Sequence, residues 1–249
     1  MKKQNKILTL IGILLLPLVW VTVKYGFNVE DRFLPSPYSL VTAFNDIEPN
    51  IFIHLFYTVL RLWVGFAAGL ITGVGLGILL YTSRSAYSLL NSTFQSLRSV
   101  PATATIPFFL LWFGFSETGR FLIVIVGVSF NLAIATYQIL LSIPDKYKVF
   151  FNSMNDKPGN YPMTFCLPFA MAQLLPTVRF SLSTAIGLIV VAEMLGSQFG
   201  LGYLIQTARS TFSMNVVFLA TIFFGIINYL TDITLVKLWK KLIFWQQRD

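Results

Sequence analysis

Long apolar segments constrain this chain more than any other feature of its sequence. A membrane-spanning helix needs roughly 20 mostly apolar residues, because it must cross a hydrocarbon layer about 30 Å thick. Only 11% of the residues are charged, whereas soluble domains carry about 25%. The chain is therefore predicted to be an all-α polytopic membrane protein with about six transmembrane helices. The predicted spans are residues 7–23, 59–81, 99–115, 121–141, 178–197 and 216–236.

The first apolar segment follows three lysines, Lys2, Lys3 and Lys6, as the apolar part of a secretory signal peptide does. It ends in the sequence WVTVKYGF, which contains no small-residue cleavage site. We therefore interpret this segment as an uncleaved anchor helix.

The distribution of positive residues predicts the orientation of the chain. Cytoplasmic loops carry an excess of lysine and arginine. If the N-terminus lies inside, the cytoplasmic segments hold 13 of the 18 positive residues, including Arg179. Both termini are therefore expected in the cytoplasm. The tryptophans, which favour the membrane interfaces, agree with this orientation, three lying near outer ends of spans and two near inner ends: Trp20, Trp63, Trp112, Trp239 and Trp245.

A polar stretch, NSMNDKPGNYPMTFCLPFA at residues 152–170, interrupts the apolar sequence between the fourth and fifth spans. It belongs to a loop, residues 142–175, that the orientation above places in the cytoplasm. Ser142 as a cap and Pro144 in the first turn suit the start of a short helix. A second short helix is expected to run from Tyr161 to Pro168.

The first of these short helices carries an apolar face. Four residues recur at helical spacing: Tyr147, Phe150, Phe151 and Met154. Two interpretations stay open at this point. Either the face docks onto a cytoplasmic partner, or the loop folds back onto its own bundle.

Four glycines in the second span recur at every fourth residue: Gly65, Gly69, Gly73 and Gly77. They share one helix face and allow another helix to approach closely. Glycine costs up to about 1 kcal/mol per helical position in water, so an aligned series indicates a packing function. Packing inside one subunit is favoured over packing between two copies.

Polar and helix-breaking residues in the third and fourth spans are candidates for a solute pathway. Pro101 and Pro107 free backbone carbonyls in the third span, and Thr103 can satisfy one of them. Asn131 and Gln138 lie seven residues apart in the fourth span, and so on one face. Two interpretations are open for the third span: it lines a pathway, or its prolines simply kink the helix. Two are also open for the amides of the fourth span: they line a polar route, or they join neighbouring helices by hydrogen bonds.

Glu193 is the candidate residue of the fifth span. An ionised side chain near the bilayer centre costs on the order of 3 kcal/mol, and the cost is smaller near the outer end, where Glu193 is placed. That position is also the C-terminal end of its helix, the unfavourable end for a carboxylate. We expect an ion pair with Arg61 or Arg209, or a gate; direct contact with an anionic solute is less favoured.

Catalytic and metal chemistry find no support in the sequence. There is no GxxxxGK[ST] loop for ATP, and the single histidine, His54, and single cysteine, Cys166, cannot form a His/Cys metal site. No cofactor is expected in this chain. The net charge of +8 is scattered between apolar runs, so nucleic acid is not an expected partner.

Four stretches, in order along the chain, resemble a known family. They are LPSPYSLVTAF (34–44), RLWVGFAAGLITGVGLGILLYTSRS (61–85), SVPATATIPFFLLWFGF (99–115) and VVAEMLGSQFGLGYLI (190–205). The chain resembles the inner-membrane permease subunits of bacterial binding-protein-dependent ABC importers, most closely the nitrate, sulfonate and taurine branch. In that family the cytoplasmic loop docks into an ATPase subunit.

The family's loop motif is degenerate here. Leu167 and Pro168 match its terminal Leu-Pro, and the family's spacing then places Asn155 at the usual glycine. Residues 149–151, Val-Phe-Phe, stand where the family has Glu-Ala-Ala. Asparagine tolerates a left-handed turn, so the loop geometry is expected to survive, whereas the usual contacts of the lost glutamate are not.

The resemblance implies a type I ABC importer permease fold and a single transmembrane permease domain over residues 1–249. Within it we expect an anchor helix and periplasmic segment at 1–52, a permease core at 53–240 and a coupling loop at 142–175. The implied partners are cytoplasmic ABC ATPase subunits, a second permease copy in a homodimer or heterodimer, an extracytoplasmic substrate-binding protein and membrane lipid. The implied location is the bacterial cytoplasmic (inner) membrane.

The implied function is a pathway for a small polar solute, such as nitrate, a sulfonate, taurine or a vitamin precursor. The chain itself is then not an enzyme, because ATP hydrolysis occurs in a partner. The alternative is a stand-alone secondary transporter or channel, for which internal repeats and ionisable residues deep in the bundle are typical. A membrane scaffold that transports nothing is a third, weaker alternative.

Overall fold

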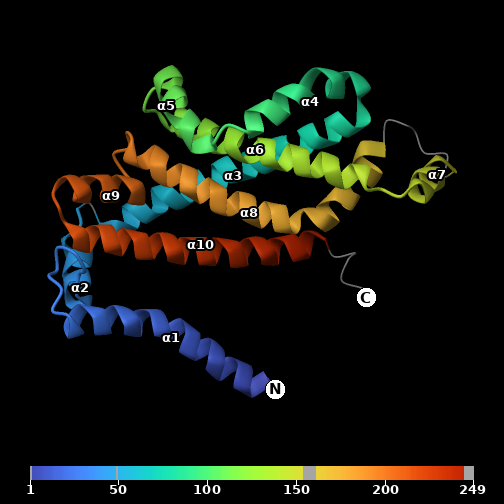
Figure 1. Ribbon diagram of the computed structural model, residues 1–249. Helices are drawn as coiled ribbons and strands as arrows, with labels where there is room; N and C mark the ends of the chain where they lie inside the picture. The colour runs from blue at the N-terminus through green and yellow to red at the C-terminus, as the bar shows by residue number, and fades with distance from the viewer. Residues whose placement is uncertain (1, 49, 154–160, 244–249) are drawn as a thin grey trace.

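The computed structural model describes residues 2–48, 50–153 and 161–243, and all of its regular structure is helical (Figure 1). The predicted all-α class is confirmed. The helices, in chain order, are α1 (Lys2–Gly26), α2 (Pro37–Asp46), α3 (Ile51–Thr82), α4 (Arg84–Arg98), α5 (Ala102–Phe113), α6 (Glu117–Leu141), α7 (Asp145–Ser153), the short π-helical turn η2 (Pro162–Cys166), α8 (Leu167–Met194), α9 (Leu201–Ser210) and α10 (Met214–Leu242).

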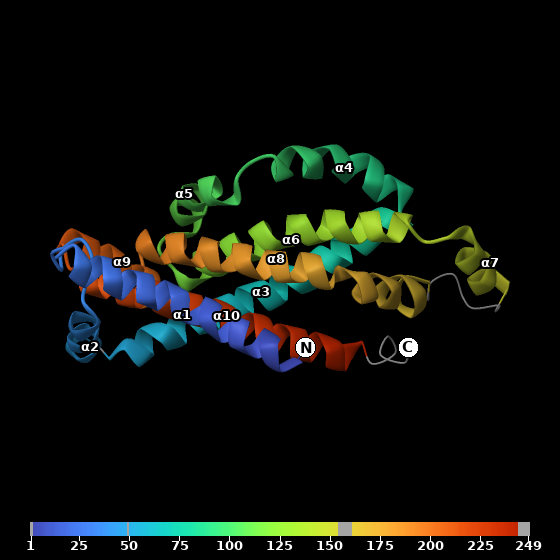
Figure 2. The ribbon, with the colours of Figure 1, turned by 60° about the horizontal axis from the view of Figure 1, so that its bottom comes forward.

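Four helical segments among the described residues are long and apolar enough to cross a membrane. They are α3, α6, the continuous segment Pro162–Met194 formed by η2 and α8, and α10. In Figures 1 and 2 they form a bundle in which α3, α6 and α10 run in one direction and α8 returns. Below, the two ends of this bundle are called the α9 end and the α7 end, after the short helices found there.

The glycine series of α3 packs against α6 within the same chain. A Cβ atom added at Gly69 would lie 2.9 Å from the Cβ of Val128, and one added at Gly73 would lie 2.7 Å from the Cβ of Leu132. Both separations are shorter than van der Waals contact. The glycines therefore allow the backbone of α3 to lie directly on α6, which agrees with the interpretation of packing inside one subunit.

The third predicted span, residues 99–115, is wrong as a single crossing. The helix found there, α5, has only 12 residues and is about 18 Å long. Instead α4 and α5 together return along the bundle from the α7 end to the α9 end (Figure 2). Their junction includes Pro101, which has no N–H to continue a helix. The polar composition of α4 conceals this arrangement in the sequence.

The predicted loop 142–175 is also corrected. Ser142 does not start the short helix; it ends α6, and its N–H donates to the carbonyl of Gln138. The short helix α7 begins at Asp145. The expected separate helix from Tyr161 to Pro168 instead continues through η2 into α8, so the span begins well before the predicted residue 178. Proline is tolerated in this first turn, where its missing N–H would have no helical partner.

The N-terminal helix α1 lies away from the four-helix bundle along most of its length (Figure 1). Near its end Trp20 stacks on Phe218 of α10, with ring centroids 6.5 Å apart, and donates to the Pro35 carbonyl. The following turn is held by Lys24, which pairs with Asp31 at 2.5 Å and lowers the pKa of that carboxyl. The apolar side chains of Leu14, Leu15, Leu16 and Leu18 on α1 are exposed and therefore available to lipid or to another chain.

Candidate functional site

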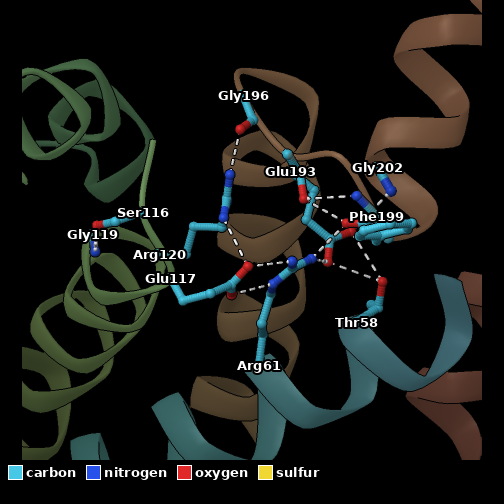
Figure 3. Close-up of polar contacts among 12 residues, drawn as sticks. Thr58, Arg61, Ser116, Glu117, Gly119, Arg120, Glu193, Gly196, Phe199 and Gly202 are labelled. Carbon is cyan, nitrogen blue, oxygen red and sulfur yellow. Dashed lines mark hydrogen bonds and ion pairs between the residues drawn. The ribbon is translucent and has the colours of Figure 1, made fainter. Parts of the chain in front are cut away.

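Four charged side chains meet at the α9 end of the bundle (Figure 3). Arg61 comes from α3, Glu117 and Arg120 come from the first turn of α6, and Glu193 comes from the last turn of α8. Arg61 and Glu193 are 2% and 1% exposed. Ionised groups this deeply buried require partners, because desolvation costs several kcal/mol per ion.

Arg61 is the centre of this ion cluster. Its Nε and Nη2 donate to both carboxylate oxygens of Glu117 at 2.7 and 2.6 Å, a bidentate arrangement. Its Nη1 donates to Glu193 and to the Phe199 carbonyl, both at 2.7 Å. The planar fork of arginine suits such two-sided pairing. The expected partner of Glu193 is thus Arg61, whereas Arg209 is exposed at the end of α9.

Glu193 receives further hydrogen bonds from uncharged groups. The Thr58 hydroxyl lies 3.0 Å from its carboxylate oxygens, and the Gly202 N–H donates at 2.9 Å. Gly202 belongs to the first turn of α9, where the helix dipole favours a negative charge. The dipole at the C-terminal end of α8 disfavours the negative charge of Glu193. The dipole at the N-terminal end of α9 compensates for this effect.

The turn between α8 and α9 has room for Glu193 only because it contains glycine. Gly200 has φ +126°, a conformation that side-chain-bearing residues rarely adopt. A Cβ at Gly202 would lie 2.7 Å from the Cβ of Glu193. The Gly200 N–H donates to Nδ1 of the buried His54, 3.1 Å away. These glycines bring the start of α9 onto the carboxylate.

Arg120 completes the cluster. It pairs with Glu117 at 2.9 Å and donates to the Gly196 carbonyl. The two arginines and two glutamates neutralise one another and join α3, α6, α8 and the turn before α9. Such an arrangement can fix the helix ends in one relative position, which is the chemistry of a latch rather than of catalysis.

Comparison with known proteins identifies the family. The model of the family described as "Binding-protein-dependent transport system inner membrane component" matches residues 65–243. The chain belongs to this family. It is a multi-pass component of the inner membrane, and in ABC importers of this kind ATP is hydrolysed by a separate subunit.

Two relatives are permeases named for aliphatic sulfonates. The putative aliphatic sulfonates transport permease protein SsuC of Bacillus subtilis is 33% identical, covering 94% of this chain and 87% of the relative. Its Escherichia coli counterpart is 32% identical, covering 89% of this chain and 86% of the relative. The taurine transport system permease protein TauC of Escherichia coli is 24% identical, covering 91% of this chain and 85% of the relative.

A solved structure shares the fold of this permease. It is described as an inward-facing conformation of the MetNI methionine ABC transporter. The TM-score is 0.61 and the sequence identity 21%, covering 78% of this chain and 99% of that chain. At this identity the comparison supports the fold alone.

The structure does not gather the predicted pathway residues of the permease into one place. Glu193 is enclosed in the ion cluster, and Thr103 is exposed on α5. Asn131 lines a pocket of about 480 Å³ between α5, α6 and α8, together with Pro101 and Thr184. Gln138 is exposed towards the α7 end of α6. Of these four residues, Asn131 is the one that lines this pocket.

The predicted coupling residues of the permease fall at the α7 end. Tyr147 on α7 is 43% exposed, and its ring lies 6.4 Å from that of Phe165. Leu167 and Pro168 begin α8. The side chains of Phe150 and Phe151, and all of Met154 and Asn155, lie outside the part of the permease that the structure describes.

Sequence reasoning missed Glu117, Arg120 and Thr58. The signal for the first two was an acidic and a basic residue three positions apart at the start of an apolar span, where a helix cap, Ser116, precedes them. Among the described residues, no group of three or more His, Cys, Asp or Glu side chains could hold a metal ion.

Proposed function

We propose that this permease forms half of a translocation pathway for a small anionic or zwitterionic solute. A second copy, or a related permease, supplies the other half. Cytoplasmic ATPase subunits drive the cycle, and an extracytoplasmic binding protein delivers the solute. Relatives named for aliphatic sulfonates, taurine and nitrate support this solute class.

The observation that carries the coupling mechanism is the position of α7. This helix projects from the bundle beyond α6 and α8, at the end opposite the ion cluster (Figures 1 and 2). A helix with apolar residues at that position offers a surface for a cytoplasmic partner. The ion cluster would then latch the outer helix ends while the ATPase moves the inner ones.

We further propose six membrane crossings with both termini in the cytoplasm. The four long spans, α1, and the combined α4 and α5 would provide them. Membrane lipid then covers the outer apolar surface, and no nucleic acid is involved. A stand-alone secondary transporter is the weaker candidate, although the structure does place one ion pair, Arg179 with Asp232, within two spans.

The coupling proposal predicts the effect of changing both Phe150 and Phe151 to serine. If these side chains anchor the ATPase, each truncation should cost roughly 2–4 kcal/mol of association. The affinity of the purified permease for its ATPase should fall on the order of a thousandfold or more. Val149→Ser is the matched control, because this apolar residue is 67% exposed on the same short helix but outside the proposed face. It should change the affinity by less than about threefold.

Folded yield must be measured on the same double variant. If the phenylalanines instead pack on their own subunit, the change will lower the amount of folded protein and leave the affinity of the remainder intact. That result would contradict the coupling assignment.

The orientation is tested by cysteine labelling. A cysteine placed at Ser116, near the ion cluster, should react with a membrane-impermeant thiol reagent added to intact cells. One placed at Asn155 should react only after permeabilisation. The native Cys166 is fully buried and should give little background. Labelling with the two positions reversed would overturn the orientation.

A further inference from the structure

An ion pair lies within the membrane-spanning part of the bundle, away from the ion cluster at the α9 end. Arg179 of α8 donates through Nε and Nη2 to the two carboxylate oxygens of Asp232 of α10, both at 2.7 Å. Each residue lies in the middle third of its long apolar helical segment, Pro162–Met194 or Met214–Leu242. The sequence-based orientation counts Arg179 among the cytoplasmic residues, whereas the structure places it inside the helical segment Pro162–Met194.

The pair is accessible from outside the chain, unlike Arg61 and Glu193 of the ion cluster. The side chains of Arg179 and Asp232 are 52% and 28% exposed. Ionisable residues within membrane-spanning helices almost always face the bundle interior or a water-filled cavity rather than lipid, because their exposure to hydrocarbon is costly. The surface around the pair is therefore expected to face water or a second permease chain.

The pair lies in an open, shallow depression with both polar and apolar lining residues. Its volume is about 560 Å³, and it lies between α8 and α10, the two helices that run side by side in Figures 1 and 2. Three further polar side chains line it together with the pair: Ser183, Asn228 and Tyr229. A pocket with convergent polar groups and a charged residue is typical of a small-molecule site.

The guanidinium of Arg179 retains donors for a ligand. Of its five N–H groups, two are used by Asp232, and the other three have no partner among the described residues. The remaining donors point away from the carboxylate in a fixed plane. This fork matches the oxygens of a sulfonate, nitrate or carboxylate group.

We propose that Arg179 is a transient contact for the anionic group of the transported solute on its way across the membrane. Asp232 orients the guanidinium and cancels most of its charge. Binding would therefore be weak enough for the solute to leave, as conduction through a pathway requires. The proposal rests on the proposed function, because it takes the pocket as part of a translocation pathway.

The test compares two thiol reagents of similar size and opposite charge. Ser183, in the same pocket, is replaced by cysteine in a Cys166→Ser background. The permease is purified with its ATPase and reconstituted in liposomes. Reaction rates are measured with 2-sulfonatoethyl methanethiosulfonate, which carries a sulfonate, and with its cationic trimethylammonium analogue. The ratio of the two rates cancels any change in thiolate fraction, since both reagents need the same thiolate.

The cysteine at position 183 should react with both aqueous reagents. Its anion-to-cation rate ratio should exceed that of the cysteine at Ser116 by about threefold, less than an unpaired guanidinium would give, because Asp232 cancels most of the charge. Arg179→Gln should reverse the preference, because Asp232 remains charged, and Arg179→Lys should restore it. The double variant Arg179→Gln, Asp232→Asn leaves no unpaired charge and should show no preference.

Two results would overturn the inference. An unreactive cysteine at position 183 in the assembled complex would mean that a second chain or lipid covers the pocket. An unchanged rate ratio in the double variant would mean that Arg179 does not attract anions. Failure of the ATPase to co-purify with the unmodified permease would contradict the proposed function instead, so the two failures are distinguishable.

Discussion

Replacing Arg61 by methionine is expected to lower the free energy of unfolding by roughly 3–5 kcal/mol, the usual cost of removing one partner of a buried ion pair. The enclosed Glu193 carboxylate would keep only Thr58 and Gly202 as hydrogen-bond donors. Glu117 would lose its bidentate partner and keep Arg120. Denaturant or thermal unfolding of the detergent-purified permease measures the effect.

The double variant Arg61→Met, Glu193→Gln separates charge from packing. A neutral glutamine can still accept from Thr58 and Gly202, and its amide can donate to the Phe199 carbonyl that Arg61 vacates. We therefore expect the double variant to be more stable than Arg61→Met alone. Arg209→Met, at an exposed arginine, should stay within about 0.5 kcal/mol of the unmodified permease. A double variant no more stable than Arg61→Met alone would contradict a coupled pair.

The second large effect is expected from the glycine series. A Cβ at Gly77 would lie 2.5 Å from the Cβ of Thr136 and 2.6 Å from the Ala133 carbonyl oxygen. Gly77→Ala must therefore push α3 away from α6, and overpacking of this kind typically costs 1–3 kcal/mol. Because each glycine allows the same close approach, changing Gly73 as well should abolish most folded protein.

Gly75 provides a matched control for this prediction. It lies on the same helix, yet nothing lies within 4 Å of an added Cβ. Gly75→Ala should be neutral or slightly stabilising, because alanine has the higher helix propensity. The amount of monodisperse protein after solubilisation and its unfolding midpoint report both changes. Equal behaviour of Gly75→Ala and Gly77→Ala would rule out the close approach of α3 to α6.

The long spans could be predicted because a bilayer imposes one simple rule on them. Uninterrupted apolar runs such as 121–141 and 216–236 lie inside the helices α6 and α10. The crossing made by α4 and α5 could not be predicted by that rule. Its first half, RSAYSLLNSTFQSLR, is too polar to read as a span, and it reaches the bundle through a few apolar contacts such as Phe94 on Phe130.

The candidate site shows the same division between local and distant information. The position of Glu193 at a helix end is local, and so its need for a cation could be inferred. Which cation serves depends on how α3 packs against α8, and that packing brings Arg61 and Glu193 together across 132 positions of sequence. The start of α9 can approach the Glu193 carboxylate because the chain reverses direction at Gly200. The positive φ of Gly200 cannot be predicted from a helical sequence pattern.

The neutrality of the ion cluster has an electrical consequence. A charge that moves across the full membrane potential exchanges about 2.3 kcal/mol per 100 mV with the field. Arg61, Arg120, Glu117 and Glu193 sum to zero, so moving them as one body performs almost no net electrical work. The helix ends they join can then rearrange at any membrane voltage with the same energy. A voltage dependence of transport would then have to come from charges outside this cluster, such as that of the solute.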